Sequence, residues 1–418
     1  MQRGALATMI FKERVILHCD CNSFFASVEA ALRPEFRGVP MAVAGSVENR
    51  HGIILAKNEL AKKYGIVTAE TVFSAKKKCP SLVLAEPHYD KYVEYSKKAN
   101  AIYAKYTDKI ESFGIDESWL DVTASHRLGS GMQIAEMIRR EIKETLGITV
   151  SIGVSFNKVF AKLGSDYKKP DAITEISRSN FREIVYPLPV SELLFVGKKT
   201  ADQLKMLGIK TIGELAAASE GILISRLGKA GSMLSKYARG EDDSPVEQVD
   251  RADAKSIGNG YTFKHDLVGR EECLTGIKYL AEEIGTKLRI RGLKCATVQL
   301  SIKDEYLRTI QRNAPQVPPT DISYEIADTA YKILCREWSD GKPIRMITVT
   351  ATNLVRADSV AEQLEFFDSG KTEERQKNGK REIAVDEIRT KFGSDSIVRA
   401  SIIDNDIGIY KPKKTTKK

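Results

Sequence analysis

Residues 148 to 156 alternate strictly between apolar side chains and small or polar ones. This alternation predicts a β-strand with one covered face and one small, polar face that we expect to be open. The segment before it, residues 132 to 146, repeats an apolar residue every four positions from Ile134 to Leu146, which predicts an amphipathic helix. Together they indicate an α+β sheet covered by helices on one side, whose uncovered side could hold a ligand.

The chain has 418 residues, more than one core normally holds, so we expect about three or more domains. With 42% hydrophobic and 29% charged residues, a mainly disordered or fibrous protein is excluded. No apolar run approaches the roughly 18 residues that span a bilayer. The N-terminal stretch lacks the apolar core of a secretory signal. We therefore expect a cytoplasmic protein with no membrane partner.

Basic residues outnumber acidic ones by 65 to 56, which favours a polyanionic partner such as nucleic acid. Much of the excess lies in two regions. Residues 193 to 240 carry eight basic and three acidic side chains, and residues 251 to 356 carry seventeen and thirteen. The six cysteines show no CxxC spacing, so neither a zinc site nor a disulfide framework is expected.

Three carboxylates stand at the ends of predicted strands. The apolar run VILHCD ends in Asp20, as in a buried strand that delivers an acid, and Asp116 and Glu117 lead into a second strand. Mg²⁺ prefers oxygen ligands, and two such ions roughly 3.5 to 4 Å apart can activate a hydroxyl and stabilise a leaving phosphate oxygen. Acidic pairs are also common on solvated surfaces, so the pattern alone leaves both interpretations open.

A region rich in short helices and glycine turns begins after Pro187 and Pro189. Within it, VGKKTADQL and the following LGI are typical of a helix-hairpin-helix, in which backbone amides at a helix start meet a DNA phosphate. We therefore predict DNA contacts at Gly197, Lys198, Lys199 and Lys229. Phe195 stands where such hairpins usually have their first glycine, and a small helical bundle with glycine caps is the alternative.

Other segments have simpler patterns. We predict a strand over 39 to 44, and helices over 24 to 32 and over 56 to 64. A second α+β unit over 251 to 356 is predicted from strands at 296 to 303 and 346 to 352 and helices at 271 to 288 and 324 to 335. The tail has a charged stretch from 371 to 382, a predicted short helix and a final run of lysines.

Several long motifs occur together in the chain: ILHCDCNSFFASVE, FGIDESWLDVT, SIGVSFNKVFAKLGSDYKKP, LGKAGSMLSKYARGEDDSPV and KSIGNGYTF. In order and spacing they resemble the Y-family translesion DNA polymerases over roughly residues 14 to 368. The resemblance implies a multidomain right hand with a palm, small fingers, a helix-hairpin-helix thumb and an α+β little finger. The implied boundaries are 14–30 and 86–186 for the palm, 31–85 for the fingers, 187–245 for the thumb, 252–357 for the little finger and 358–418 for the tail.

The resemblance also implies the site residues. Asp20, Asp116 and Glu117 would be the catalytic carboxylates that bind two Mg²⁺ ions, with the Cys21 carbonyl as a further ligand. Phe25 would be the steric gate that selects deoxyribonucleotides, beside Phe24 in the nucleotide pocket. Lys62 and Lys169 would bind the triphosphate. The substrates would be dNTPs and a primed DNA template.

Two positions depart from the common family pattern. Asn22 replaces an acid and brings the sequence nearer the polymerase V catalytic subunit than polymerase IV at that point, which makes accessory proteins of the SOS type candidate partners. Glu59 stands where many members have a tyrosine that contacts the triphosphate, so we do not expect it to bind phosphate.

The tail motif QLEFFD resembles the peptide that binds the bacterial sliding clamp. It would place its apolar side chains in clefts of the clamp, and local packing is the alternative. The predicted clamp-binding residues are Gln363, Leu364, Phe366 and Phe367.

Two other functions fit parts of the pattern. A noncatalytic DNA-binding scaffold would use only the basic regions, and a nucleotide cyclase would use only the acids. Neither accounts for all the motifs, so we expect a template-directed, low-fidelity DNA polymerase that acts in translesion synthesis and DNA repair.

Overall fold

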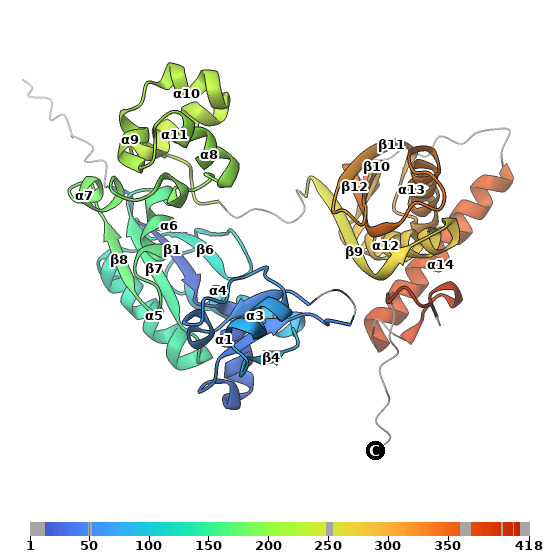
Figure 1. Ribbon diagram of the computed structural model, residues 1–418, viewed down its shortest axis with the longest axis horizontal. Helices are drawn as coiled ribbons and strands as arrows, with labels where there is room; N and C mark the ends of the chain where they lie inside the picture. Colours follow the sequence, from blue (N-terminus) through green and yellow to red (C-terminus); the bar gives the residue numbers. More distant parts are fainter. Residues whose placement is uncertain are drawn as a thin grey trace, which may run out of the picture. The chain divides into compact units, whose positions relative to one another are not determined.

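The computed structural model describes residues 13–48, 50, 52–247, 254–359, 369–393, 396–403 and 405–409. The chain forms two compact units (Figure 1). The first comprises residues 1–45 and 53–249, and the second comprises residues 46–52 and 250–418. All six cysteines are free. None of the helices within the described ranges has both the length and the apolar composition needed to cross a membrane.

A five-stranded sheet forms the centre of the first unit. Its middle strand, β1, pairs antiparallel with β6 on one side and with β7 on the other. This register places Asp20 opposite Glu117 and Ser151, and His18 opposite Trp119. In order across the sheet, the strands are β5 (Ile110–Ser112), β6 (Glu117–Asp121), β1 (Ile16–Cys21), β7 (Val150–Ser155) and β8 (Ile173–Ile176).

Helices cover both faces of this sheet. The apolar face packs against α1 (Phe24–Leu32), α4 (Tyr89–Tyr103) and α5 (Gly131–Leu146), which confirms the helices predicted over 24–32 and 132–146. The opposite face, with the small residues of β7, lies under α6 (Lys158–Tyr167), so every residue of β7 is buried.

The prediction of an open face on β7 was therefore wrong. A Cβ on Gly153 would lie 1.8 Å from the carbonyl oxygen of Ala161, and one on Gly164 would lie 2.9 Å from the Gly153 Cα. The small residues are present because a helix packs directly on the strand, and glycine allows that close approach.

A three-stranded sheet with two short helices follows β1 and α1. The strand predicted over 39–44 is confirmed as β2, but the helix predicted over 56–64 is confirmed only over Glu59–Lys62, because Ala56 and Lys57 pair with β2 as a strand. The Asn58 side chain accepts a hydrogen bond from the Ala61 amide, so the helix starts only after it. The elements are β3 (Ile54–Lys57), β2 (Met41–Ala44), β4 (Val83–Ala85), α2 (Glu59–Lys62) and α3 (Val72–Lys78).

Short helices complete the first unit, as the glycine turns predict. They share an apolar core that includes residues of α6. The helices are α7 (Phe181–Val185), α8 (Lys198–Met206), α9 (Ile212–Ala217), α10 (Glu220–Leu227) and α11 (Lys229–Ala238).

The second unit is a four-stranded antiparallel sheet with helices packed on one face (Figure 1). The predicted strands and helices of this unit are confirmed, while β9 and β11 were not predicted. β11 lies at the sheet edge, where its prolines are tolerated because one side of the strand needs no ladder partner. The elements are β11 (Thr309–Thr320), β10 (Leu293–Lys303), β12 (Ile344–Arg356), β9 (Ser256–Leu267), α12 (Arg270–Ile290) and α13 (Ser323–Glu337).

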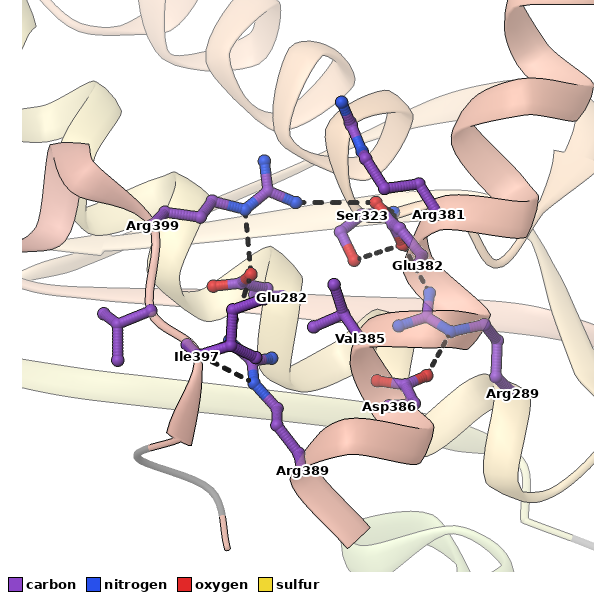
Figure 2. Close-up of a pocket in the computed structure, with 11 residues that line it drawn as sticks. Glu282, Arg289, Ser323, Arg381, Glu382, Val385, Asp386, Arg389, Ile397 and Arg399 are labelled. Carbon is purple, nitrogen blue, oxygen red and sulfur yellow. Dashed lines mark hydrogen bonds and ion pairs between the residues drawn. The ribbon is translucent and has the colours of Figure 1, made fainter. Parts of the chain in front are cut away.

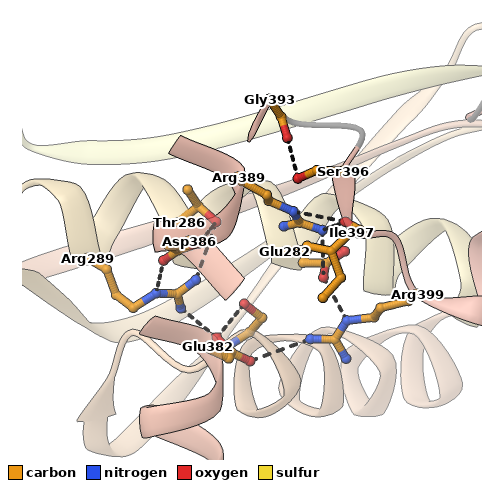
Figure 3. A network of polar contacts seen from close by, with 11 residues as sticks. Glu282, Thr286, Arg289, Glu382, Asp386, Arg389, Gly393, Ser396, Ile397 and Arg399 are labelled. Atoms are coloured by element: carbon orange, nitrogen blue, oxygen red, sulfur yellow. Dashed lines mark hydrogen bonds and ion pairs between the residues drawn. The ribbon is translucent and has the colours of Figure 1, made fainter. Parts of the chain in front are cut away.

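The tail forms a helix of 24 residues, α14 (Ser369–Phe392), where the sequence predicted only a charged stretch and a short helix. Figure 3 shows how it is attached to α12 by ion pairs. Arg289 of α12 donates to Glu382 and, at 2.6 Å, to Asp386 of α14. The Glu382 carboxylate also accepts from the Ser323 backbone amide at 2.9 Å and from its hydroxyl at 2.8 Å. α14 thus caps the first turn of α13.

Candidate active site

The predicted carboxylates meet where β1 ends and β6 begins. Asp20 and Glu117 face each other across the antiparallel pair, so their side chains leave the same face of the sheet. The backbone amide of Cys21 donates to the carbonyl of Asp116 at 2.9 Å, which holds Asp116 beside them. Among the described residues, the closest group of candidate metal ligands is His18, Asp20 and Glu117, with atoms within 4.8 Å of one another. Asp116 therefore lies next to this trio and is not part of it.

The two adjacent acids have opposite pKa shifts. Burial, together with the negative charges of Asp20 and Glu117, raises the pKa of Asp116 to about 6. Burial also disfavours the ionised form of Glu117, but contacts with His18 and Lys162 outweigh it and lower the pKa of Glu117 to about 2. Asp116 therefore holds its proton more tightly than an ordinary aspartate, whereas Glu117 is ionised and paired with Lys162.

Two lysines pair with these carboxylates. Lys162, on α6, donates from Nζ to Oε2 of Glu117 at 2.6 Å. Lys169 follows α6 and donates to Oδ2 of Asp20 at 2.7 Å and to Asp166 at 2.6 Å. The sequence predicted Lys169 as a triphosphate ligand, but it did not single out Lys162, whose position depends on α6 packing over β7 and β1.

His18 is a buried member of the site that the sequence analysis missed. Its Nε2 lies 3.3 Å from Oε2 of Glu117, and its Nδ1 lies 2.8 Å from the Ser165 hydroxyl. The same Ser165 hydroxyl donates to the Lys162 carbonyl at 2.8 Å, which links His18 to α6. Burial lowers the pKa of His18. The sequence did offer a signal for His18. It is a polar residue within an apolar run, and it stands two positions before Asp20, so both side chains lie on the same face of the strand.

The donors in this cluster fit Mg²⁺, because Asp20, Asp116 and Glu117 supply hard oxygen ligands. Burial and the nearby charges of Asp20 and Glu117 raise the pKa of Asp116, and a divalent cation would offset the repulsion among these carboxylates. Cys21 contributes no thiolate, since burial raises the pKa of its thiol to about 12. The role of its carbonyl as a metal ligand stays a prediction.

An aromatic stack joins α1, which follows β1 in the chain, to α4. The ring of Phe25 is parallel to that of Tyr92, with centroids 4.1 Å apart and an interplanar angle of 11°. The Tyr92 hydroxyl donates to the buried Glu29 carboxylate at 2.7 Å, which fixes the ring under Phe25. Phe24, which the sequence predicted in the nucleotide pocket, is only 3% exposed and packs in the core. The sequence analysis did not identify Tyr92 or Glu29.

Lys62 is the last residue of α2 and pairs with Glu59, which we did not expect to bind phosphate. Its Nζ donates to Oε1 of Glu59 at 2.5 Å, and the Ser23 hydroxyl donates to the same oxygen at 3.2 Å. The negative charge of Glu59 is therefore balanced by Lys62.

The predicted DNA-binding residues lie at two helix starts. Gly197 is the N-cap of α8, and Lys198 and Lys199 are the first two residues of that helix. Lys229 is the first residue of α11. Phe195 has a φ of +68° and is 56% exposed, so it adopts the left-handed conformation usual for the glycine that it replaces. For a residue with a side chain this conformation costs roughly 1–2 kcal/mol.

The predicted clamp-binding residues Gln363, Leu364, Phe366 and Phe367 lie outside the described residues.

A separate pocket lies in the second unit, along α14 (Figure 2). Arg289, Arg389 and Arg399 pair there with Glu282, Glu382 and Asp386. These charges neutralise one another, so we interpret the pocket as part of the contact that holds α14 in place.

Comparison with known proteins gives three family matches. The impB/mucB/samB family matches residues 19–166, its C-terminal domain matches residues 254–366, and the IMS family HHH motif matches residues 178–209. A DNA polymerase IV of Acetivibrio thermocellus is 47% identical over 94% of this chain and 98% of the relative. A DNA polymerase IV 1 of Bacillus subtilis is 37% identical over 85% and 86%. A solved Y-family DNA polymerase chimera is 25% identical with a TM-score of 0.74, covering 82% of this chain and 99% of its own.

Proposed function

The chain belongs to the impB/mucB/samB family of Y-family DNA polymerases, and from this premise we propose how its residues carry out the reaction. It is a template-directed, low-fidelity DNA polymerase of translesion synthesis and DNA repair. The reaction transfers a nucleotide from a dNTP to a primer 3′-hydroxyl. The observation that carries the assignment of the site is the register that sets Asp20 opposite Glu117, with Asp116 adjacent.

Asp20, Asp116 and Glu117 hold the divalent cations, and the Cys21 carbonyl is a further oxygen ligand. When bound, two Mg²⁺ ions promote attack by the primer hydroxyl on the α-phosphate and stabilise charge on the leaving pyrophosphate. The placement of Asp20 and Glu117 on paired strands fixes the spacing of their oxygens before any ligand arrives. This preorganisation lowers the reorganisation needed for catalysis.

Lys169 and Lys62 bind the triphosphate. Both are paired with carboxylates, Lys169 with Asp20 and Lys62 with Glu59. Phosphate oxygens offer the lysines another negative partner, and the carboxylate of Asp20 is then free for a metal ion. The Phe25 ring, held against Tyr92, selects the sugar by occupying the space of a 2′-hydroxyl.

Primed DNA is the second substrate. The starts of α8 and α11, with Lys198, Lys199 and Lys229, bind backbone phosphates, and the match to the HHH motif supports the first of these. We assign the palm to 14–30 and 86–186, the fingers to 31–85, the thumb to 187–245, the little finger to 252–357 and a tail to 358–418. The bacterial sliding clamp, recruited through Gln363 to Phe367, and SOS-type accessory proteins are proposed partners in the cytoplasm.

Primer extension tests the assignment of the site. Purified protein with Mg²⁺ and dNTPs should extend a primed template, and Asp20→Asn should bind the same DNA without extending it. DNA binding by the wild type without any extension would indicate the noncatalytic scaffold. Turnover of ATP in the absence of DNA would indicate the cyclase.

A further inference from the structure

Lys162 makes a contact that the proposed reaction does not use. Its side chain is 20% exposed, and its Nζ donates to Oε2 of Glu117 at 2.6 Å. The next nearest carboxylate, Asp166 on the same helix, is 3.8 Å away. Lys162 therefore interacts chiefly with a carboxylate assigned to metal binding, whereas Lys169 and Lys62 are assigned to the triphosphate.

The charges around Lys162 are unbalanced without it. Asp20 and Glu117 are paired across β1 and β6, and the Cys21 amide holds Asp116 beside them, so three carboxylates lie close together. Lys169 offsets part of this charge through Asp20, but phosphate competes for it. Lys162 is then the cation that stays with the cluster when a nucleotide is bound.

Lys162 and a metal ion compete for the same atom. Oε2 of Glu117 accepts the hydrogen bond from Lys162 and faces Nε2 of His18 at 3.3 Å, so this oxygen is already surrounded. A cation that binds Glu117 through Oε2 must displace the ammonium group or share the oxygen with it. Either way, a positive charge a few ångströms from the metal opposes its binding.

We propose that Lys162 is a built-in counterion of Glu117 that weakens divalent-cation binding until a nucleoside triphosphate brings further negative charge. The hydrogen bond from Lys162 holds the Glu117 carboxylate in place, so the site is formed before metal arrives. It also makes stable loading with metal depend on the nucleotide. This inference rests on the proposed assignment of Glu117 as a metal ligand.

The test measures Mn²⁺ binding to the full-length protein without DNA or nucleotide, by electron paramagnetic resonance of free Mn²⁺. Lys162→Met should lower the dissociation constant by about tenfold or more, because near the protein surface a unit charge at about 4 Å is worth several kcal/mol. Lys162→Gln, which keeps a hydrogen-bond donor but not the charge, should tighten binding similarly. Lys162→Arg, which keeps the charge, should stay within about threefold of wild type.

Two controls locate the effect. Lys168→Met removes the same charge from an exposed neighbour and should leave the dissociation constant within about twofold of wild type. Asp20→Asn should weaken Mn²⁺ binding, which shows that the measured ions occupy this cluster. Unchanged or weaker binding in both Lys162→Met and Lys162→Gln would overturn the proposal, as would equal tightening in Lys168→Met.

A nonhydrolysable dNTP adds a second measurement. It should tighten Mn²⁺ binding more in the wild type than in Lys162→Met, because the variant lacks the opposing charge. An equal effect in the two proteins would overturn the dependence on nucleotide. Primer extension is measured separately. A protein that shows the expected Mn²⁺ binding but no extension would refute the polymerase assignment of the site, and the inference that Lys162 opposes metal binding would still stand.

Discussion

Replacing Asp116 by asparagine should abolish primer extension and at the same time stabilise the metal-free protein. The pKa of this carboxyl is about 6 in the folded protein, against an ordinary value of 3.8, because of burial and the charges of Asp20 and Glu117. The folded state thus binds the proton more tightly than the unfolded state. Its stability falls as the pH rises from about 4 to about 6, and the full cost is present at pH 7.

The size of the effect follows from the two pKa values. Each pH unit between them is worth about 1.4 kcal/mol, so the ionised carboxylate destabilises the fold by about 3 kcal/mol at neutral pH. Asp116 is only partly buried and water screens some of the repulsion, so we expect a gain of about 1–3 kcal/mol in Asp116→Asn. For a unit of this size, each kcal/mol raises the melting temperature by about 2–4 °C.

Denaturant unfolding in EDTA at pH 7.5 measures the gain, and repeating it at pH 5 should give a smaller one. Asp108→Asn, at an exposed position, is the matched control and should change neither stability nor extension. Added Mg²⁺ should stabilise the wild type more than Asp116→Asn, because a ligand that binds only the folded state stabilises it. An Asp116→Asn protein no more stable than wild type in EDTA would refute the argument that burial and repulsion destabilise the ionised carboxylate, and measurable extension would refute the metal role.

Three further predictions concern other regions. Phe25→Ala should raise ribonucleotide insertion relative to deoxyribonucleotide insertion, since the ring stacked on Tyr92 no longer fills the space of the 2′-hydroxyl, and an unchanged ratio in single-nucleotide kinetics would reject the steric gate. Glu382→Ala should destabilise the second unit by about 2–4 kcal/mol, from the lost cap and the lost charged hydrogen bonds. Hydrogen exchange in the first turn of α13 should accelerate, while the exposed Glu387→Ala should leave it unchanged. Replacing Phe366 and Phe367 by alanine should reduce clamp-stimulated synthesis but not basal extension, and equal loss of both would indicate a folding role.

Periodic patterns in the sequence were enough to predict the type and the apolar face of several helices and strands. The four-residue repeat of α5 and the alternation of β7 each predict an element and its apolar face, and both are confirmed. The small face of β7 was misinterpreted because serine and glycine are equally compatible with water and with a closely packed helix. Deciding between the two required Gly164 on α6, which the alternation of β7 does not include.

The carboxylates of the site could be predicted, but their partners could not. Asp20 ends an apolar strand, and this placement is visible in the sequence. Lys162 and His18 gain their roles only from the register of β1 with β6 and from the packing of α6, which join residues far apart in the chain. The same holds for Glu382, whose contact with Ser323 requires the tail to fold back on the second unit.

Gly153 and Gly164 have no functional groups, yet they govern the electrostatics of the site. They set the thickness of the contact between α6 and the sheet. The lysines stand on or just after α6 and the acids stand on the strands, so this thickness is also the separation between opposite charges. A methyl group at either glycine would change that separation without altering any charged residue. Variation at these positions is therefore a route by which such polymerases could adjust their demand for metal while keeping every catalytic side chain.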